Sequence, residues 1–295
     1  EHFPAGCFAN YFGSAIVKEL QVQLAWNRLL AIVEEQAQVL MRTAFSTVVR
    51  EAGDLSAGVF DVRGEMLAQA VTGTPGHVNS MAEAVKKFLT KYPASKLEPG
   101  DVLLTNDPWD GTGHLNDFTV VTPVFLSSEI IGFFASTSHI ADVGGRGFGP
   151  DANDLFEEGL RVPISYLLQK GEPNKTLMDL IKANVRDPLV AEGDLYSLIA
   201  CNEAGSIELL EMLNDLDLRD LEELGKIILD RSKNAMREEI GRLGRHDVQY
   251  EMIIDGYDEP VRICCRMVID QGVVDLDFGG SSPASPKGIN VPFPY

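Results

Sequence analysis

The most constraining feature of the sequence is a long stretch, residues 17–45, that contains neither glycine nor proline. Its apolar residues recur at steps of three and four, the repeat of one face of an α-helix. The stretch therefore predicts one long helix near the start of the chain. Its apolar side chains, such as Trp26, Leu29 and Val33, are explained equally well by core packing and by contact with a partner helix.

Strand signals follow this helix. Residues 57–61 and 65–68 flank Arg63-Gly64 and predict a hairpin. Ser80 and Glu83 have the spacing of a capping box, which predicts a short helix from there through Lys91. Further stretches are rich in β-branched and aromatic residues, which favour strands. These predicted strands are residues 102–105, 118–125 and 130–137.

The second half of the chain changes character twice. Residues 142–163 are dense in glycine, aspartate and asparagine and predict a long loop, and such loops are often functional. A helical stretch from about 177 to 243 is interrupted near Pro188 and near residues 215–217, and residues 249–278 predict strands again. The fold class is therefore α+β. We predict an N-terminal helix plus β region (1–170), a helical region (171–245) and the start of a C-terminal β region (246–295) in a chain that ends abruptly, like a fragment.

Composition excludes several classes of protein. The formal net charge of −19 argues against nucleic acid and anionic membrane surfaces, which bind clustered lysine and arginine. No apolar stretch reaches the roughly 18 residues that span a bilayer, and no signal peptide is visible. The four cysteines show no CxxC spacing, which favours free thiols and a cytoplasmic protein.

The chemistry is indicated by three of the five histidines, which are His114, His139 and His77. His114 and Asp117 are three residues apart at the start of one predicted strand, and His139 follows the end of the next. If these two strands pair as an antiparallel hairpin, the start of the first adjoins the end of the second. His114, Asp117 and His139 would then lie together at one end of the sheet.

Two imidazoles with carboxylates suit Zn²⁺, Mn²⁺ or Fe²⁺, and the thiolates of a structural zinc site are missing. Such an ion polarises a carbonyl or lowers the pKa of a bound water. Asp54 is the preferred further ligand, and Glu51 is its competitor. Spacing alone also allows the alternative that these side chains only cap or satisfy the core.

The remaining motifs are less specific. His77 precedes the predicted helix at Ser80, where it could contact substrate or transfer a proton, although ordinary loop hydrogen bonding is an alternative. The glycine-rich stretch 144–149 satisfies no phosphate-binding pattern, so Arg146 could pair with an anion or belong to a lid. No serine-hydrolase elbow occurs. His2 and His246 have no supporting context and are expected at the surface.

Several motifs occur in the same order as in one known family. They are Glu51 to Ser56 (EAGDLS), Thr105 to Pro108 (TNDP), Gly113 to Asp117 (GHLND), Ser138-His139 with Asp142 to Gly145 (DVGG), and Glu158 to Pro163 (EGLRVP). With them, the chain resembles the hydantoinase B/oxoprolinase family over nearly its whole length. That family includes N-methylhydantoinase B, the C-terminal part of 5-oxoprolinase, and subunits of acetone and acetophenone carboxylases.

The resemblance implies a division of labour within a hetero-oligomer. A hydantoinase A-like subunit with an actin-like fold would use ATP to phosphorylate the substrate's carbonyl oxygen. By similarity, this chain would hold the metal through Asp54, His114, Asp117 and His139. In our leading hypothesis, Asp117 and His77 take part in the catalytic step. The expected substrate is a cyclic amide such as a hydantoin or 5-oxoproline.

Two departures from the family pattern and two alternatives remain. This chain has Gly111-Thr112-Gly113-His114 where members often have Gly-Gly-Thr-His, and family subunits are longer. An ATP-dependent ketone carboxylase is the alternative enzyme. A non-catalytic scaffold subunit is the alternative from another class of protein.

Overall fold

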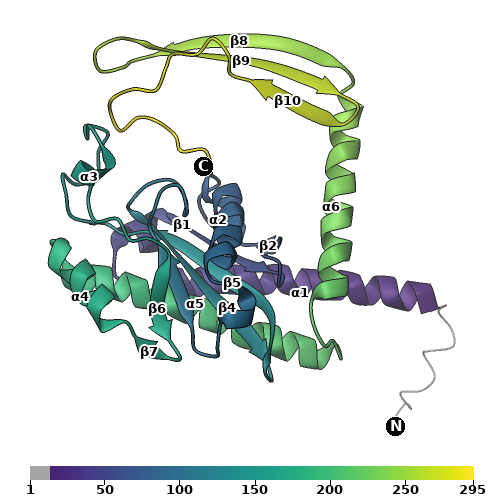
Figure 1. The fold of residues 1–295 in the computed structure, drawn as a ribbon. Helices are drawn as coiled ribbons and strands as arrows, with labels where there is room; N and C mark the ends of the chain where they lie inside the picture. The colour runs from purple at the N-terminus through teal and green to yellow at the C-terminus, as the bar shows by residue number, and fades with distance from the viewer. Residues whose placement is uncertain (1–13) are drawn as a thin grey trace, which may run out of the picture.

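The computed structural model describes residues 14–295, and its main body is a seven-stranded antiparallel sheet with helices on both faces (Figure 1). The strand order is β2-β1-β5-β4-β3-β6-β7, and a second sheet has the order β10-β9-β8. This confirms the predicted α+β class.

The helices are α1 (Ser14–Thr43), α2 (His77–Lys91), α3 (Leu155–Glu158), α4 (Lys175–Asn184), α5 (Pro188–Asp215) and α6 (Glu222–Arg242), with the short helices η1 (Val48–Ala52) and η2 (Ala94–Lys96). The strands are β1 (Leu55–Phe60), β2 (Met66–Gln69), β3 (Val102–Thr105), β4 (Asp117–Leu126), β5 (Glu129–His139), β6 (Ser165–Gln169), β7 (Glu172–Pro173), β8 (His246–Ile254), β9 (Val261–Asp270) and β10 (Val273–Asp277).

Side-chain alternation along the central strands fills a core on each face of the large sheet. Val120 of β4 and Phe134 of β5 pack with residues of α1 and α5. Their neighbours Val121 and Phe133 point to the other face and pack with residues of α2. The first residue of α2 can therefore meet side chains at the end of that second face.

Most predicted elements are present. The predicted helix 17–45 corresponds to α1, and the two interruptions of the helical stretch fall between α4, α5 and α6. The predicted hairpin is formed by β1 and β2. The Asp61 carboxylate closes its turn by accepting hydrogen bonds from the backbone N–H groups of Arg63 (2.9 Å) and Glu65 (2.8 Å).

One local prediction was wrong, one was incomplete, and one hairpin was not predicted. The capping box was wrong, because α2 begins at His77 and the Ser80 hydroxyl donates to the carbonyl oxygens of Gly76 and His77 inside the helix. The loop 142–163 contains the single helical turn α3, capped by Asp154. The hairpin of β6 and β7 was not predicted. Its turn is formed by Lys170-Gly171, both with positive φ angles.

The second sheet lies apart from the main body at the far end of α6 (Figure 1). Its strands are largely exposed, and Tyr250 in β8 has 72% of its surface accessible. The three regions predicted at 1–170, 171–245 and 246–295 stay a prediction. No helix among the described residues is long and apolar enough to cross a membrane. His2 lies outside the described residues, and His246 is exposed as expected.

Candidate metal centre

The predicted pairing of β4 and β5 brings the first residue of β4 beside the last residue of β5. Asp117 and His139 are direct cross-strand partners, and the next pair on the same face is Thr119 and Thr137, whose hydroxyls lie 3.0 Å apart. Directly opposed residues of an antiparallel pair point to the same face. Asp117 and His139 therefore share the α2 face at the end of the sheet.

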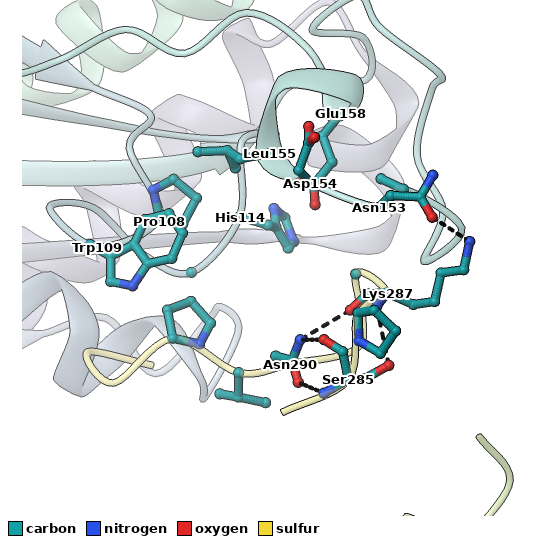
Figure 2. A pocket seen from close by; sticks show the side chains of 16 residues that line it. Pro108, Trp109, His114, Asn153, Asp154, Leu155, Glu158, Ser285, Lys287 and Asn290 are labelled. Carbon is teal, nitrogen blue, oxygen red and sulfur yellow. Dashed lines mark hydrogen bonds between the residues drawn. The ribbon is translucent and has the colours of Figure 1, made fainter. Parts of the chain in front are cut away.

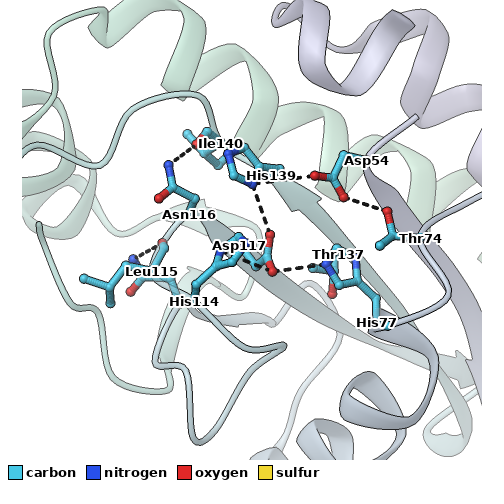
Figure 3. A network of polar contacts seen from close by, with 12 residues as sticks. Asp54, Thr74, His77, His114, Leu115, Asn116, Asp117, Thr137, His139 and Ile140 are labelled. Atoms are coloured by element: carbon cyan, nitrogen blue, oxygen red, sulfur yellow. Dashed lines mark hydrogen bonds and ion pairs between the residues drawn. The ribbon is translucent and has the colours of Figure 1, made fainter. Parts of the chain in front are cut away.

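His114 completes a compact group with these two residues (Figure 3). One ligand atom from each of His114, Asp117 and His139 can be chosen so that all three atoms lie within 4.8 Å of one another. The Nδ1 atom of His114 lies 3.4 Å from Asp117 Oδ2, and the Nδ1 atom of His139 lies 3.6 Å from Asp117 Oδ1. These separations are too long for good hydrogen bonds but suit donors that converge on an ion.

Burial and protonation also fit a divalent cation. The Nδ1 atoms of His114 and His139 and the Oδ1 atom of Asp117 are buried and make no hydrogen bond. Burial alone would raise the pKa of Asp117, but the facing His139, His77 and His114 lower it to about 2. Burial lowers the pKa of His114 and outweighs the opposing charge of Asp117. An ionised carboxylate and a neutral imidazole are the ligand forms that metals bind.

The sequence left Asp54 and Glu51 as competing candidates for the further ligand, and the two residues lie in different places. Asp54 directly precedes β1, which pairs with β5, and its Oδ2 atom is 3.7 Å from His139 Nδ1. Its Oδ1 atom accepts a hydrogen bond of 2.6 Å from the Thr74 hydroxyl. Glu51 is exposed within the short helix η1. The geometry therefore brings Asp54 to the cluster, with an orientation that Thr74 restrains.

His77 is the first residue of α2 and is almost completely buried. Its Nε2 atom lies 3.1 Å from Asp117 Oδ2, while its Nδ1 atom has no hydrogen-bond partner. His77 thus contacts the carboxylate at the middle of the cluster, whereas the sequence placed it in a separate loop. Its closeness results from the packing of α2 on the sheet, for which no local sequence signal exists.

Two asparagines of the sequence motifs hold the backbone around the cluster. The Asn106 side chain donates to the carbonyl oxygens of Leu115 (2.7 Å) and Leu160 (2.8 Å) and accepts from the Val162 N–H (2.6 Å). Asn116 donates to the Ile140 carbonyl oxygen at 2.8 Å, next to His139. Such bonds fix a loop that lacks regular structure. These two asparagines therefore position the segments that carry His114 and His139.

The glycine-rich loop supplies an aromatic wall. The Phe148 ring meets His114 and His139 edge-on, with ring centroids 5.7 and 4.9 Å apart. Sequence reasoning missed Phe148, whose only signal was being the one aromatic residue among glycines. Arg146, considered for anion binding or a lid, donates to the Glu157 carboxylate and the Asp151 carbonyl oxygen, both at 3.0 Å.

A cavity of about 290 Å³ adjoins the cluster, and His114 forms part of its wall. Figure 2 shows the His114 ring between Pro108 and Trp109 on one side and Asp154 on the other. Burial and the neighbouring charge of Asp154 raise the pKa of Glu158, which also lines the cavity. The volume is at the lower end of what small-molecule sites enclose. The cavity therefore suits a small ligand.

Thiol chemistry is not supported at Cys201. This residue is buried in α5, and burial raises its pKa to about 12. Because the thiolate is the reactive form, we expect Cys201 to resist iodoacetamide in the native protein at pH 8 and to react after unfolding. Peptide mapping by mass spectrometry measures this, with the less buried Cys265 as the internal reference. Native labelling of Cys201 at the rate of Cys265 would contradict the structure.

The fold and the cluster together define an α+β protein with a candidate metal centre at the end of its central sheet. The family model described as hydantoinase B/oxoprolinase matches residues 18–295. The chain belongs to this family.

The chain is also similar to an uncharacterized protein and to two solved structures. An uncharacterized protein of Methanocaldococcus jannaschii is 33% identical over 270 residues, covering 89% of this chain and 47% of its own length. The ATP-dependent caprolactamase of Pseudomonas jessenii superposes with a TM-score of 0.80 at 24% identity, covering 91% of this chain and 47% of that chain. A nucleotide-free acetone carboxylase gives a TM-score of 0.79 at 19% identity, covering 92% and 38%. These two structures establish the shared fold, and the chain spans half or less of the length of all three proteins.

Proposed function

We propose that this protein is the metal-bearing subunit of an ATP-dependent enzyme that opens a small cyclic amide. The observation that carries the proposal is the cluster of His114, Asp117 and His139, in which Asp117 and His139 are buried, with Asp54 beside it and a small cavity next to it. The family includes hydantoinase and oxoprolinase in its description, and the caprolactamase of the same fold is ATP-dependent. Hydantoins, 5-oxoproline and caprolactam are all cyclic amides.

Each residue of the cluster has a distinct task in this proposal. Asp54, His114, Asp117 and His139 would hold a divalent ion, which supplies Lewis-acid polarisation of a carbonyl and lowers the pKa of a water molecule. His77 lies against Asp117 Oδ2 and keeps a second ring nitrogen without a partner. That nitrogen suits proton transfer to the ring nitrogen that leaves when the amide C–N bond breaks.

The nucleotide chemistry would belong to a partner. We propose a separate ATPase subunit of the hydantoinase A type as the phosphate donor, as the resemblance to the family implies, and the lack of a GxxxxGK[ST] motif in this sequence is compatible with it. Phosphorylation of the carbonyl oxygen would turn a resistant amide into an activated imidate phosphate. Overall, ATP, two waters and the cyclic amide give ADP, phosphate and the ring-opened amino acid.

Ketone carboxylation is the second candidate function. It is favoured by the acetone carboxylase, whose TM-score of 0.79 is nearly that of the caprolactamase. The same cluster would then hold the enolate oxygen of a ketone while carboxylation forms a new C–C bond. The cavity is large enough for either substrate.

The decisive experiment uses the chain co-purified with its ATPase partner. We expect ATP hydrolysis to rise with a hydantoin or lactam and to match ring opening measured by chromatography. His139→Ala should remove this coupled activity, whereas His246→Ala, on an exposed strand, should leave it unchanged. Ketone consumption that depends on bicarbonate would favour the carboxylase instead. Full activity of the His139→Ala complex would instead favour the alternative that this chain is a non-catalytic scaffold subunit.

A further inference from the structure

Tyr295 packs directly against two glycines, and each glycine precedes a histidine of the cluster. The pairs are Gly76-His77 and Gly113-His114. A Cβ atom added at Gly76 would overlap the phenol oxygen of Tyr295, and one added at Gly113 would overlap the edge of its ring. At both glycines, the three atoms nearest to the added Cβ, apart from the glycine and its chain neighbours, belong to Tyr295. One aromatic ring therefore lies against both histidine-bearing loops.

The two glycines differ in a way that makes this contact testable. Gly113 has a φ of +128°, which other residues rarely adopt, so any substitution there is strained regardless of space. Gly76 has an ordinary φ of −62°. Its lack of a side chain is therefore explained by the Tyr295 ring rather than by backbone conformation.

The segment that carries Tyr295 is anchored near the cluster. The Gly288 N–H donates to the carbonyl oxygens of Pro150 (3.1 Å) and Ala152 (3.0 Å), which ties the segment to the loop before α3, and the Tyr295 N–H closes a local turn onto the Pro292 carbonyl oxygen (3.0 Å). The rings of Tyr295 and His77 meet edge-on, with centroids 6.4 Å apart. Figure 1 shows this end of the chain beside the start of α2.

We propose that Tyr295 is a positioning residue for the metal centre, which it serves by clamping the Gly76-His77 and Gly113-His114 segments around Asp117. His114 most needs such support, because it lies in irregular chain and its side chain is 39% exposed. Ligands on loops are held less precisely than ligands on strands unless neighbouring side chains fix them. This inference rests on the proposed function, because it requires that the cluster binds an ion.

The test measures Co²⁺ and Zn²⁺ affinity of the purified chain by competition with a chromophoric chelator. We expect Tyr295→Ala to weaken binding about 10- to 100-fold, the usual loss when a group supporting a ligand is removed. The Co²⁺ visible spectrum should change as well, because it reports ligand geometry. Tyr295→Phe keeps the ring and should restore both. Phe293→Ala, in the same segment and fully exposed, is the matched control.

A double-mutant cycle isolates the clamp from general loss of structure. Gly76→Ala should weaken Co²⁺ binding when Tyr295 is present and have no further effect in a Tyr295→Ala background. Equal effects in both backgrounds would overturn the clamp, and so would normal affinity in Tyr295→Ala. A wild-type chain that binds neither ion would instead refute the proposed metal centre, so the two failures are distinguishable.

Discussion

Replacing Asp117 with asparagine is expected to abolish metal binding while leaving the protein folded. The substitution keeps the shape of the side chain but removes the charge that His77, His114 and His139 surround. Loss of a charged ligand should exceed the effect of losing a supporting group, so we expect affinity to fall by more than about 100-fold. Elemental analysis and chelator competition on the purified chain measure this.

The same variant separates the metal-centre interpretation from a purely structural role. The lowered pKa of Asp117 means that its charge also stabilises the metal-free protein, so asparagine should cost some stability under either interpretation, and metal content is the measurement that separates the two. If Asp117 only satisfied the core, asparagine would lower stability and leave metal content unchanged. Asp142→Asn is the matched control, since Asp142 follows His139 closely but pairs with Arg186 at 2.6 Å.

Phe134→Ala is expected to destabilise the protein by about 3–5 kcal/mol, the usual cost of emptying a large buried aromatic site. Phe134 is fully buried in β5, within the core formed with α1 and α5. Its ring also lies so close to α5 that a Cβ atom at Gly205 would press against it. Urea unfolding measures the loss as a lower midpoint with an unchanged slope.

The control for this prediction is Phe156→Ala. Phe156 lies in the short helix α3 and is 87% exposed, so its removal should leave the free energy of unfolding nearly unchanged. Similar midpoints for the two variants would mean that Phe134 does not fill the core as the structure shows. An altered slope for Phe134→Ala would indicate a change in the compactness of the native or unfolded state.

The helix α1 and the strands β4 and β5 could be predicted because each carries a local signal. The helix has unbroken apolar periodicity, and the strands are rich in β-branched and aromatic residues. Antiparallel pairing of neighbouring strands then brought Asp117 and His139 together without further information. That part of the cluster follows from chain connectivity alone.

The remaining neighbours of the cluster depend on packing between distant segments. Asp54 is near His139 because β1 pairs with β5, and His77 is near Asp117 because α2 lies on that face of the sheet. Neither arrangement leaves a periodic or spacing signal. The sequence offered Asp54 as the preferred further ligand with Glu51 as its competitor, and the resemblance to the family also pointed to Asp54, whereas nothing in the sequence indicated that Tyr295 would reach the cluster.

Asp54, Asp117 and His139 come from the ends of three adjacent strands, β1, β4 and β5, so they form a set only when the sheet is folded. An ion that binds this set binds the native chain and not the unfolded one. It would then stabilise the native state by about 4 kcal/mol at a thousandfold excess over its dissociation constant. If the cluster binds an ion, the supply of metal would thus govern how long each molecule survives proteolysis.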